Sequence, residues 1–208
     1  MATIRILLAL LYFAVIGSNW RADRSVISYG VSHPSTNYAR IHFPDGGREK
    51  VLAIAEKEIG VQEDHENSGA RVDTYNAYVG LKKVPWCASF VSWVFGQAGY
   101  MQPRTAWSPA LFPGNRLAKN PLAGMVLGVY FQELKRIAHC GIVAGVRGDW
   151  IESIEGNTSK NGSREGTGVF RRTRHKRTIR CYADWYLEHA PGTFLQSQIV
   201  DLPCVADK

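Results

Sequence analysis

The first part of the chain carries apolar residues at the three- and four-residue spacing of amphipathic helices. This spacing predicts a helix over residues 48–59 and a second over residues 68–79, with Ser68 as its N-terminal cap and a glycine after each helix. Cys87 opens a third predicted helix, over residues 87–99, whose apolar positions share one face. The cysteine therefore falls in the first turn of that helix.

The second part changes to short segments that are rich in branched and aromatic residues and are separated by turn signals. They predict strands over residues 125–131, 141–146, 150–154 and 168–174. Gly148-Asp149 is typical of a tight hairpin turn. Residues 101–124, which contain four prolines, predict a long loop with a short helix around Trp107. Helices followed by strands predict an α+β fold, with N-terminal helices packed on a small antiparallel sheet.

The N-terminal segment indicates export. A short positive start, an uncharged apolar run and a small polar segment predict a signal peptide over residues 1–22, with an uncleaved membrane anchor as the alternative. Residues 23–47 are polar and irregular, which predicts a linker or arm. A folded domain is expected over 48–190 and a tail over 191–208. We therefore expect a periplasmic or extracellular protein.

Composition permits a packed core and favours anionic partners. Hydrophobic residues make up 45% and charged residues 21% of the 208 residues, and the net charge is +7. The basic run 171–177 forms either a solvated strand face or a contact with anionic envelope polymers. No nucleic-acid-binding motif accompanies the run, so we expect no nucleic-acid partner.

The cysteines are too sparse for a disulfide scaffold. The chain has four, at positions 87, 140, 181 and 204, and Cys181 with Cys204 is a candidate bridge. A catalytic Cys87 would have to remain unbridged. No cysteine or histidine pair has zinc-ligand spacing, so we predict no metal and no cofactor.

Cys87, His139 and Glu155 fit the requirements of cysteine hydrolysis. A thiol at a helix N-terminus is favoured as thiolate, and the reaction also needs a base and a group that orients it. In a hairpin the start of one strand lies beside the end of the next, so we expect His139 near Glu155 and Asn157. The structural alternatives are a buried filler cysteine, a capped histidine and turn-stabilising polar residues.

Three segments of the chain resemble motifs of CHAP domains. Segment 85–93 (Pro-Trp-Cys-Ala-Ser-Phe-Val-Ser-Trp), followed by Gln-Ala-Gly at 97–99, resembles the cysteine motif of the family. Segment 139–143 (His-Cys-Gly-Ile-Val) resembles its His-x-Gly motif, and segment 154–157 (Ile-Glu-Gly-Asn) its third motif, at the end of a strand. CHAP domains are papain-like cysteine amidohydrolases and peptidases, related to the NlpC/P60 group, that cut bacterial peptidoglycan.

The resemblance covers about residues 48–187 and implies roles for particular residues. Cys87 would be the nucleophile and His139 the general base, with Glu155 orienting the base and Asn157 assisting. Residues 59–63 and 66–69 also resemble the segment that precedes the cysteine in a CHAP-like subgroup and lines the substrate groove; the alternative is an inter-helix loop with a cap. The residues expected to contact substrate are Trp86, Glu63, Asn67 and Trp107.

Two features depart from the family pattern. Cys140 stands where a valine is common, and this thiol is either inert or able to oxidise with Cys87. The acidic residues before the cysteine lack the spacing of the calcium site found in some phage CHAP domains, so calcium is not expected.

The hypothesis from sequence is therefore an exported peptidoglycan hydrolase, either amidase or endopeptidase, in a CHAP-like catalytic domain over residues 48–190. The alternatives are a papain-like acyltransferase or amidase that acts on a non-wall substrate, and an inactive module that binds wall peptides. An immunity protein is an expected partner if the protein is an antibacterial effector.

Overall fold

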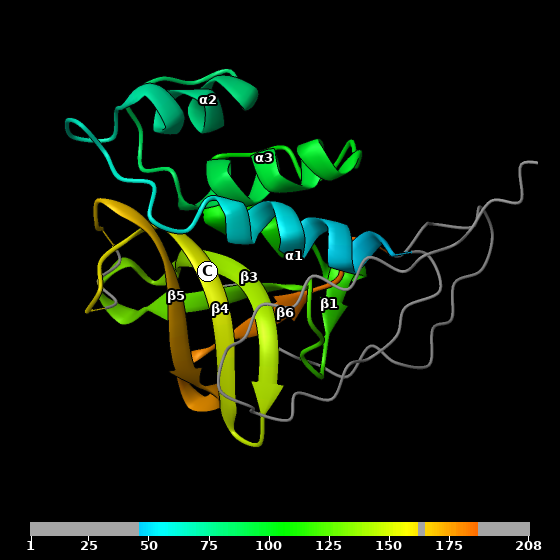
Figure 1. Ribbon diagram of the computed structural model, residues 1–208. Helices are drawn as coiled ribbons and strands as arrows, with labels where there is room; N and C mark the ends of the chain where they lie inside the picture. The colour runs from blue at the N-terminus through cyan, green and yellow to red at the C-terminus, as the bar shows by residue number, and fades with distance from the viewer. Residues whose placement is uncertain (1–45, 162–164, 187–208) are drawn as a thin grey trace, which may run out of the picture. The chain divides into compact units, whose positions relative to one another are not determined.

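A computed structural model describes residues 46–161 and 165–186, and these residues form an α+β fold (Figure 1). Three α-helices and a six-stranded antiparallel sheet with strand order β1-β6-β2-β3-β4-β5 make up the described part. The helices are α1 (Gly47–Lys57), α2 (Ala70–Tyr78) and α3 (Cys87–Ala98). The strands are β1 (Leu117–Ala118), β2 (Val126–Phe131), β3 (Arg136–Arg147), β4 (Trp150–Thr158), β5 (Gly168–His175) and β6 (Cys181–Ala183). The predicted α+β class, with helices beside an antiparallel sheet, is confirmed.

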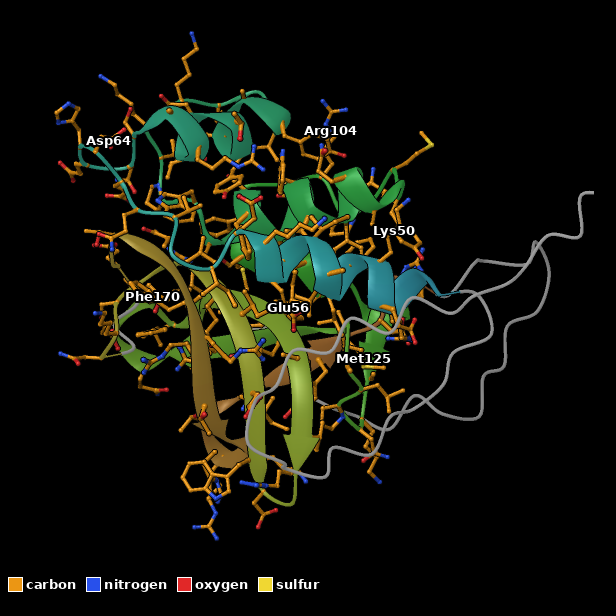
Figure 2. All side chains as sticks on the ribbon, viewed as in Figure 1. Lys50, Glu56, Asp64, Arg104, Met125 and Phe170 are labelled. Carbon is orange, nitrogen blue, oxygen red and sulfur yellow. The ribbon has the colours of Figure 1, made fainter. Side chains whose placement is uncertain are left out.

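Helix α3 lies at the centre of the helical layer. It packs against strands β3 and β4 on one side and against α1 and α2 on the others, as Figure 1 shows. Ten of its twelve residues are buried, so its burial extends well beyond the single apolar face expected from sequence. Glu56 of α1, labelled in Figure 2, reaches strand β5, where Arg171 donates to its carboxylate at 2.9 Å. This contact ties α1 to the sheet.

Several predicted boundaries differ from those observed. Ser68 does not cap α2: the N-cap is Gly69, and the Ser68 hydroxyl lies 3.1 Å from the Asp73 carboxylate instead. Strand β3 begins five residues before the predicted start at 141, and β4 continues four residues beyond the predicted end at 154. Because both strands are longer than predicted, His139 and Glu155 lie inside the sheet and not at its open end.

The connections between the elements agree better with the predictions from sequence than the strand boundaries do. The predicted turn at Gly148 and Asp149 joins β3 to β4, with Arg147 paired to Trp150. A short 3-10 helix (Ser108–Leu111) begins directly after Trp107, where a short helix was expected. Strands β1 and β6 were not predicted, because two and three residues are too few to produce a strand pattern.

None of the helices within 46–161 and 165–186 is both long and apolar enough to span a membrane. The expected signal peptide over 1–22, nearly all of the 23–47 arm and the 191–208 tail fall outside the described residues.

Candidate active site

Cys87 is the first residue of α3 and lies where that helix meets the sheet. The first helical hydrogen bond runs from Phe90 N–H to the Trp86 carbonyl at 2.8 Å, so the backbone N–H of Cys87 and of the next two residues precede the helical ladder. Trp86 occupies the N-cap position and provides no side-chain cap. The Cys87 side chain is 4% exposed, and its Sγ lies 3.4 Å from the Ser108 hydroxyl oxygen.

His139 and Glu155 form a buried pair on the two neighbouring strands. The His139 Nε2 atom lies 2.8 Å from the Glu155 Oε2 atom, and both side chains are fully buried. Their proximity follows from the antiparallel pairing of β3 with β4, as the hairpin argument expects. The strand predicted from residue 141 begins at Arg136 instead, so His139 lies within β3 and is fully buried. Its second ring nitrogen, Nδ1, is buried and makes no hydrogen bond to any described residue.

Arg174 extends the pair into a longer series of charges. Its Nε and Nη2 atoms donate to the two Glu155 carboxylate oxygens, each at 2.6 Å, and its side chain is only 13% exposed. The Ser153 hydroxyl donates to the same carboxylate at 2.6 Å. Burial would raise the pKa of Glu155, but the hydrogen bonds from Arg174 and His139 hold it well below its ordinary value. Glu155 is therefore ionised at neutral pH.

The pKa values of the cysteine and the histidine move in opposite directions. Hydrogen bonding from the Cys140 thiol lowers the pKa of Cys87 well below its ordinary value, and His139 and Ser108 lower it further, against the opposing effect of burial. Burial would lower the pKa of His139, but Cys87 and Glu155 raise it to about 9. A thiolate beside an imidazolium is the resulting state at neutral pH.

Cys140 differs from Cys87 although the two thiols interact. Its side chain is fully buried, and burial together with Cys87 raises the pKa of Cys140 well above its ordinary value. Cys140 therefore stays a protonated thiol that can donate to the Cys87 sulfur. Neither cysteine is in a disulfide.

Close contacts explain why two positions of the sequence motifs are occupied by glycine. A Cβ atom on Gly141 would lie 2.5 Å from Cγ of Glu155, because that side chain crosses the backbone of β3 to reach His139. A Cβ atom on Gly156 would lie 2.7 Å from the Trp86 ring and 2.8 Å from Phe90. Both positions need glycine so that the groups around them can pack closely.

A pocket of about 430 Å³ opens at the cysteine. This volume is within the range of small-molecule binding sites. Its lining comes from the loop before α3, the segment around Trp107 and the start of β3: Leu81, Val84, Pro85, Cys87, Thr105, Ala106, Trp107, Ser108, Arg136 and Ala138. The pocket therefore reaches Cys87 at the start of α3.

Among the four residues expected to contact substrate, only Trp107 lines this pocket. Trp86 is fully buried, so that expectation is wrong: its indole N–H donates to Glu63 at 2.5 Å, and its ring packs inside the core. Glu63 lines a separate pocket together with its neighbours up to Glu66 and with Thr167. Asn67 lines neither pocket and lies in a turn with a φ of 52°.

Asn157 positions the cysteine segment and not the histidine. When the amide is oriented with its oxygen toward the Trp86 N–H and its nitrogen toward the Gly166 carbonyl, it accepts from the first at 3.3 Å and donates to the second at 2.7 Å. Asn157 itself has a φ of 54°, in the left-handed region that asparagine tolerates better than most residues. It therefore fixes the residue directly before Cys87, which is a positioning role.

Sequence reasoning missed Ser108, the contribution of Cys140 and above all Arg174. Arg174 belongs to the basic run that was expected to be a solvated or polymer-binding face. The alternation of side chains along a strand could have distinguished Arg174 from the exposed members of the run, because it puts residues 172 and 174 on the face opposite to 171 and 173. No sequence spacing linked Ser108 to the cysteine.

The described residues contain no cluster of three or more histidine, cysteine or acidic side chains that could hold a metal ion. Cys181 is buried in β6, and its proposed partner Cys204 lies outside the described residues.

No protein-family model matches the sequence, and no curated protein matches it. Two solved structures are similar: "The crystal structure of Ly7917", at 16% identity with a TM-score of 0.39, and "The crystal structure of Ly7917 with the hydrolyzing product of MDP", at 17% identity with a TM-score of 0.37. Each similarity covers 65% of this chain, and the chain spans 60% and 61% of the two structures. TM-scores this low define neither the fold nor the function of the chain.

Proposed function

We propose that this protein is an exported peptidoglycan hydrolase that cleaves an amide bond of the wall peptide, with a papain-like fold of the CHAP and NlpC/P60 type. The observation that carries the chemistry is the buried His139–Glu155 pair, 2.8 Å apart, together with Cys87 at the start of α3, whose pKa the nearby His139 helps to lower. The resemblance of the three sequence motifs to CHAP domains supports the wall peptide as substrate.

In the first step, the Cys87 thiolate attacks the carbonyl carbon of the scissile amide. The negative charge that develops on the carbonyl oxygen is stabilised by the backbone N–H groups that precede the helical ladder of α3. A donor of this kind contributes about 3–4 kcal/mol to catalysis in well-studied hydrolases.

In the second step, the His139 imidazolium donates its Nδ1 proton to the leaving amine, and the C–N bond breaks to give an acyl-enzyme. The neutral ring then accepts a proton from water, whose oxygen attacks the thioester and releases the acid. Glu155 keeps the ring oriented through Nε2, and Arg174 and Ser153 hold Glu155 in place. The cycle ends with the thiolate and imidazolium restored.

The test is digestion of purified cell wall, read by zymography and by mass spectrometry of the released muropeptides. We expect the full chain to release peptides with new amino and carboxyl ends, and Cys87→Ala to release none. Cys181→Ala, which removes another buried cysteine outside the site, is the matched control and should retain activity. Wall cleavage by Cys87→Ala would contradict the mechanism.

The two alternative functions predict different outcomes of the same experiments. An acyltransferase or amidase that acts on another substrate would show rapid alkylation of Cys87 near neutral pH but no wall cleavage. An inactive wall-binding module would show neither. The lowered pKa of Cys87 favours an active thiolate enzyme over the module.

We also propose two partners for the protein. The exposed Arg171 and Arg177, on and after β5, bind anionic envelope polymers, which a salt-sensitive pull-down with such polymers would test. An immunity protein would be expected only if the target is a competitor's wall.

A further inference from the structure

Arg136 places a fixed positive charge in the pocket that contains the candidate nucleophile. It is the first residue of β3, and together with Ala138 it lines the pocket at Cys87. The pairing of β3 with β2 is irregular between these two residues, because Val129 pairs with His139 and Tyr130 with Ile137, and both Arg136 and Ala138 line the pocket. Arg136 is also the one charged side chain among the pocket's lining residues other than the ionisable cysteine.

The contacts of Arg136 leave part of its hydrogen-bonding capacity available. Its guanidinium carbon lies 4.2 Å from the centre of the Trp107 ring, so the ring supports one face of the planar group. One Nη1 hydrogen bond, of 3.1 Å, runs to the carbonyl of Ile137. No acidic side chain among the described residues pairs with Arg136. A guanidinium has five N–H donors in its plane, and stacking on a ring leaves that plane open.

The balance of charge in the pocket also favours an anion. The Cys87 thiolate and the His139 imidazolium offset one another, and Glu155 is offset by Arg174. Arg136 therefore gives the substrate side of the site a net positive charge. The rest of the lining is uncharged, and much of it is apolar, which strengthens the field of a single fixed cation.

We propose that the substrate carries a free carboxylate beside the scissile amide and that Arg136, braced by Trp107, binds this carboxylate. This inference rests on the proposed function and narrows its substrate class to amides next to an ionised carboxyl group. A planar guanidinium can bind a carboxylate through two parallel hydrogen bonds, which fix the orientation of the carboxylate and offset its negative charge. A site that binds a charged group in this way discriminates strongly against the neutral analogue.

The test uses two alkylating reagents that differ only in the proposed feature. Iodoacetate carries a carboxylate next to the carbon that reacts, and iodoacetamide carries a carboxamide there; in both cases the Cys87 sulfur displaces iodide. The rate constants for the full chain are measured at pH 7, with the modified residue assigned by peptide mass spectrometry. The measured quantity is the iodoacetate rate divided by the iodoacetamide rate.

We expect Arg136→Gln to lower this ratio about tenfold, which is the loss of one charge-assisted hydrogen bond, and Arg136→Lys to lower it less. Arg147→Gln is the matched control, because it removes the same charge from the exposed far end of the same strand, and it should leave the ratio unchanged. The ratio cancels any change in the reactivity of the Cys87 sulfur that affects both reagents equally, such as a change in its pKa.

An unchanged ratio in Arg136→Gln, or an equal fall in Arg147→Gln, would overturn the proposal. The result does not depend on wall cleavage, so failure of the carboxylate site is distinguishable from failure of the proposed function. If the full chain does cleave wall peptides, a second measurement applies. Peptides with a free carboxyl group should show a lower KM than their amidated forms, and Arg136→Gln should remove that difference.

Discussion

Arg174→Met tests whether the buried series of charges holds the site together. The substitution removes both hydrogen bonds to Glu155 and leaves a fully buried carboxylate with one cation fewer. Loss of one partner from a buried ion pair costs about 3–5 kcal/mol. In a domain of this size that corresponds to a fall in Tm of roughly 6–20 °C. Differential scanning fluorimetry at pH 7 measures it.

Arg171→Met is the matched control, three residues away on the same strand. The Arg171 side chain is 42% exposed, against 13% for Arg174, and its partners Glu56 and Glu152 are themselves partly exposed. An exposed ion pair of this kind contributes about 0–1 kcal/mol. We therefore expect the Tm of Arg171→Met to lie within a few degrees of the Tm of the unmodified protein.

The pH dependence gives the Arg174 prediction a second, independent readout. The folded pKa of Glu155 lies well below its ordinary value of 4.5, so its contribution to stability is present above pH 4.5 and is lost as the pH falls toward the folded pKa. Arg174→Met raises that folded pKa, which shrinks the contribution. The difference in Tm between the unmodified protein and Arg174→Met should therefore narrow as the pH falls from 5 toward 2. A variant that matches Arg171→Met at pH 7 would refute the reasoning.

Two further substitutions test the thiol and the steric contacts. Cys140→Ala removes the strongest influence that lowers the pKa of Cys87, so the pH profile of Cys87 alkylation by iodoacetamide should move to higher pH while the plateau rate stays the same. Gly141→Ala places a methyl group 2.5 Å from the Glu155 side chain, so it should destabilise the fold by about 1–3 kcal/mol and reduce the alkylation rate. Gly114→Ala is its control, since a Cβ atom there meets nothing within 4 Å.

Superimposable pH profiles for Cys140→Ala and the unmodified protein would show that the neighbouring thiol has no influence on the nucleophile. For Gly141→Ala, melting and labelling indistinguishable from those of Gly114→Ala would mean that the Glu155 side chain moves aside at no cost.

The helices and the central hairpin could be read from the sequence because their signals are local. Helical spacing placed Cys87 at a helix start, and the turn at Gly148 placed His139 beside Glu155, which the structure finds 2.8 Å apart. Local patterns do not specify how far a strand continues, so the burial of His139 was not foreseen. A longer strand moved the pair from the edge of the sheet into its interior.

The rest of the site depends on contacts that are distant in sequence. Arg174 reaches Glu155 from a third strand, and Ser108 reaches Cys87 from a proline-containing loop. Trp86 shows the opposite error: an aromatic residue beside a nucleophile suggested substrate contact, yet its indole is used inside the core to hold Glu63. A large ring is as easily recruited for packing as for binding, and only its burial distinguishes the two.

The paired shifts of Cys87 and His139 have a consequence for folding. When the chain folds at neutral pH, the thiol gives up a proton and the ring takes one, so the site transfers a proton internally and exchanges none with solvent. Between pH 6.5 and about 9, the contribution of His139 to stability declines with rising pH, while that of Cys87 grows. The two trends offset each other, so within this pH range the summed contribution of Cys87 and His139 to stability changes little.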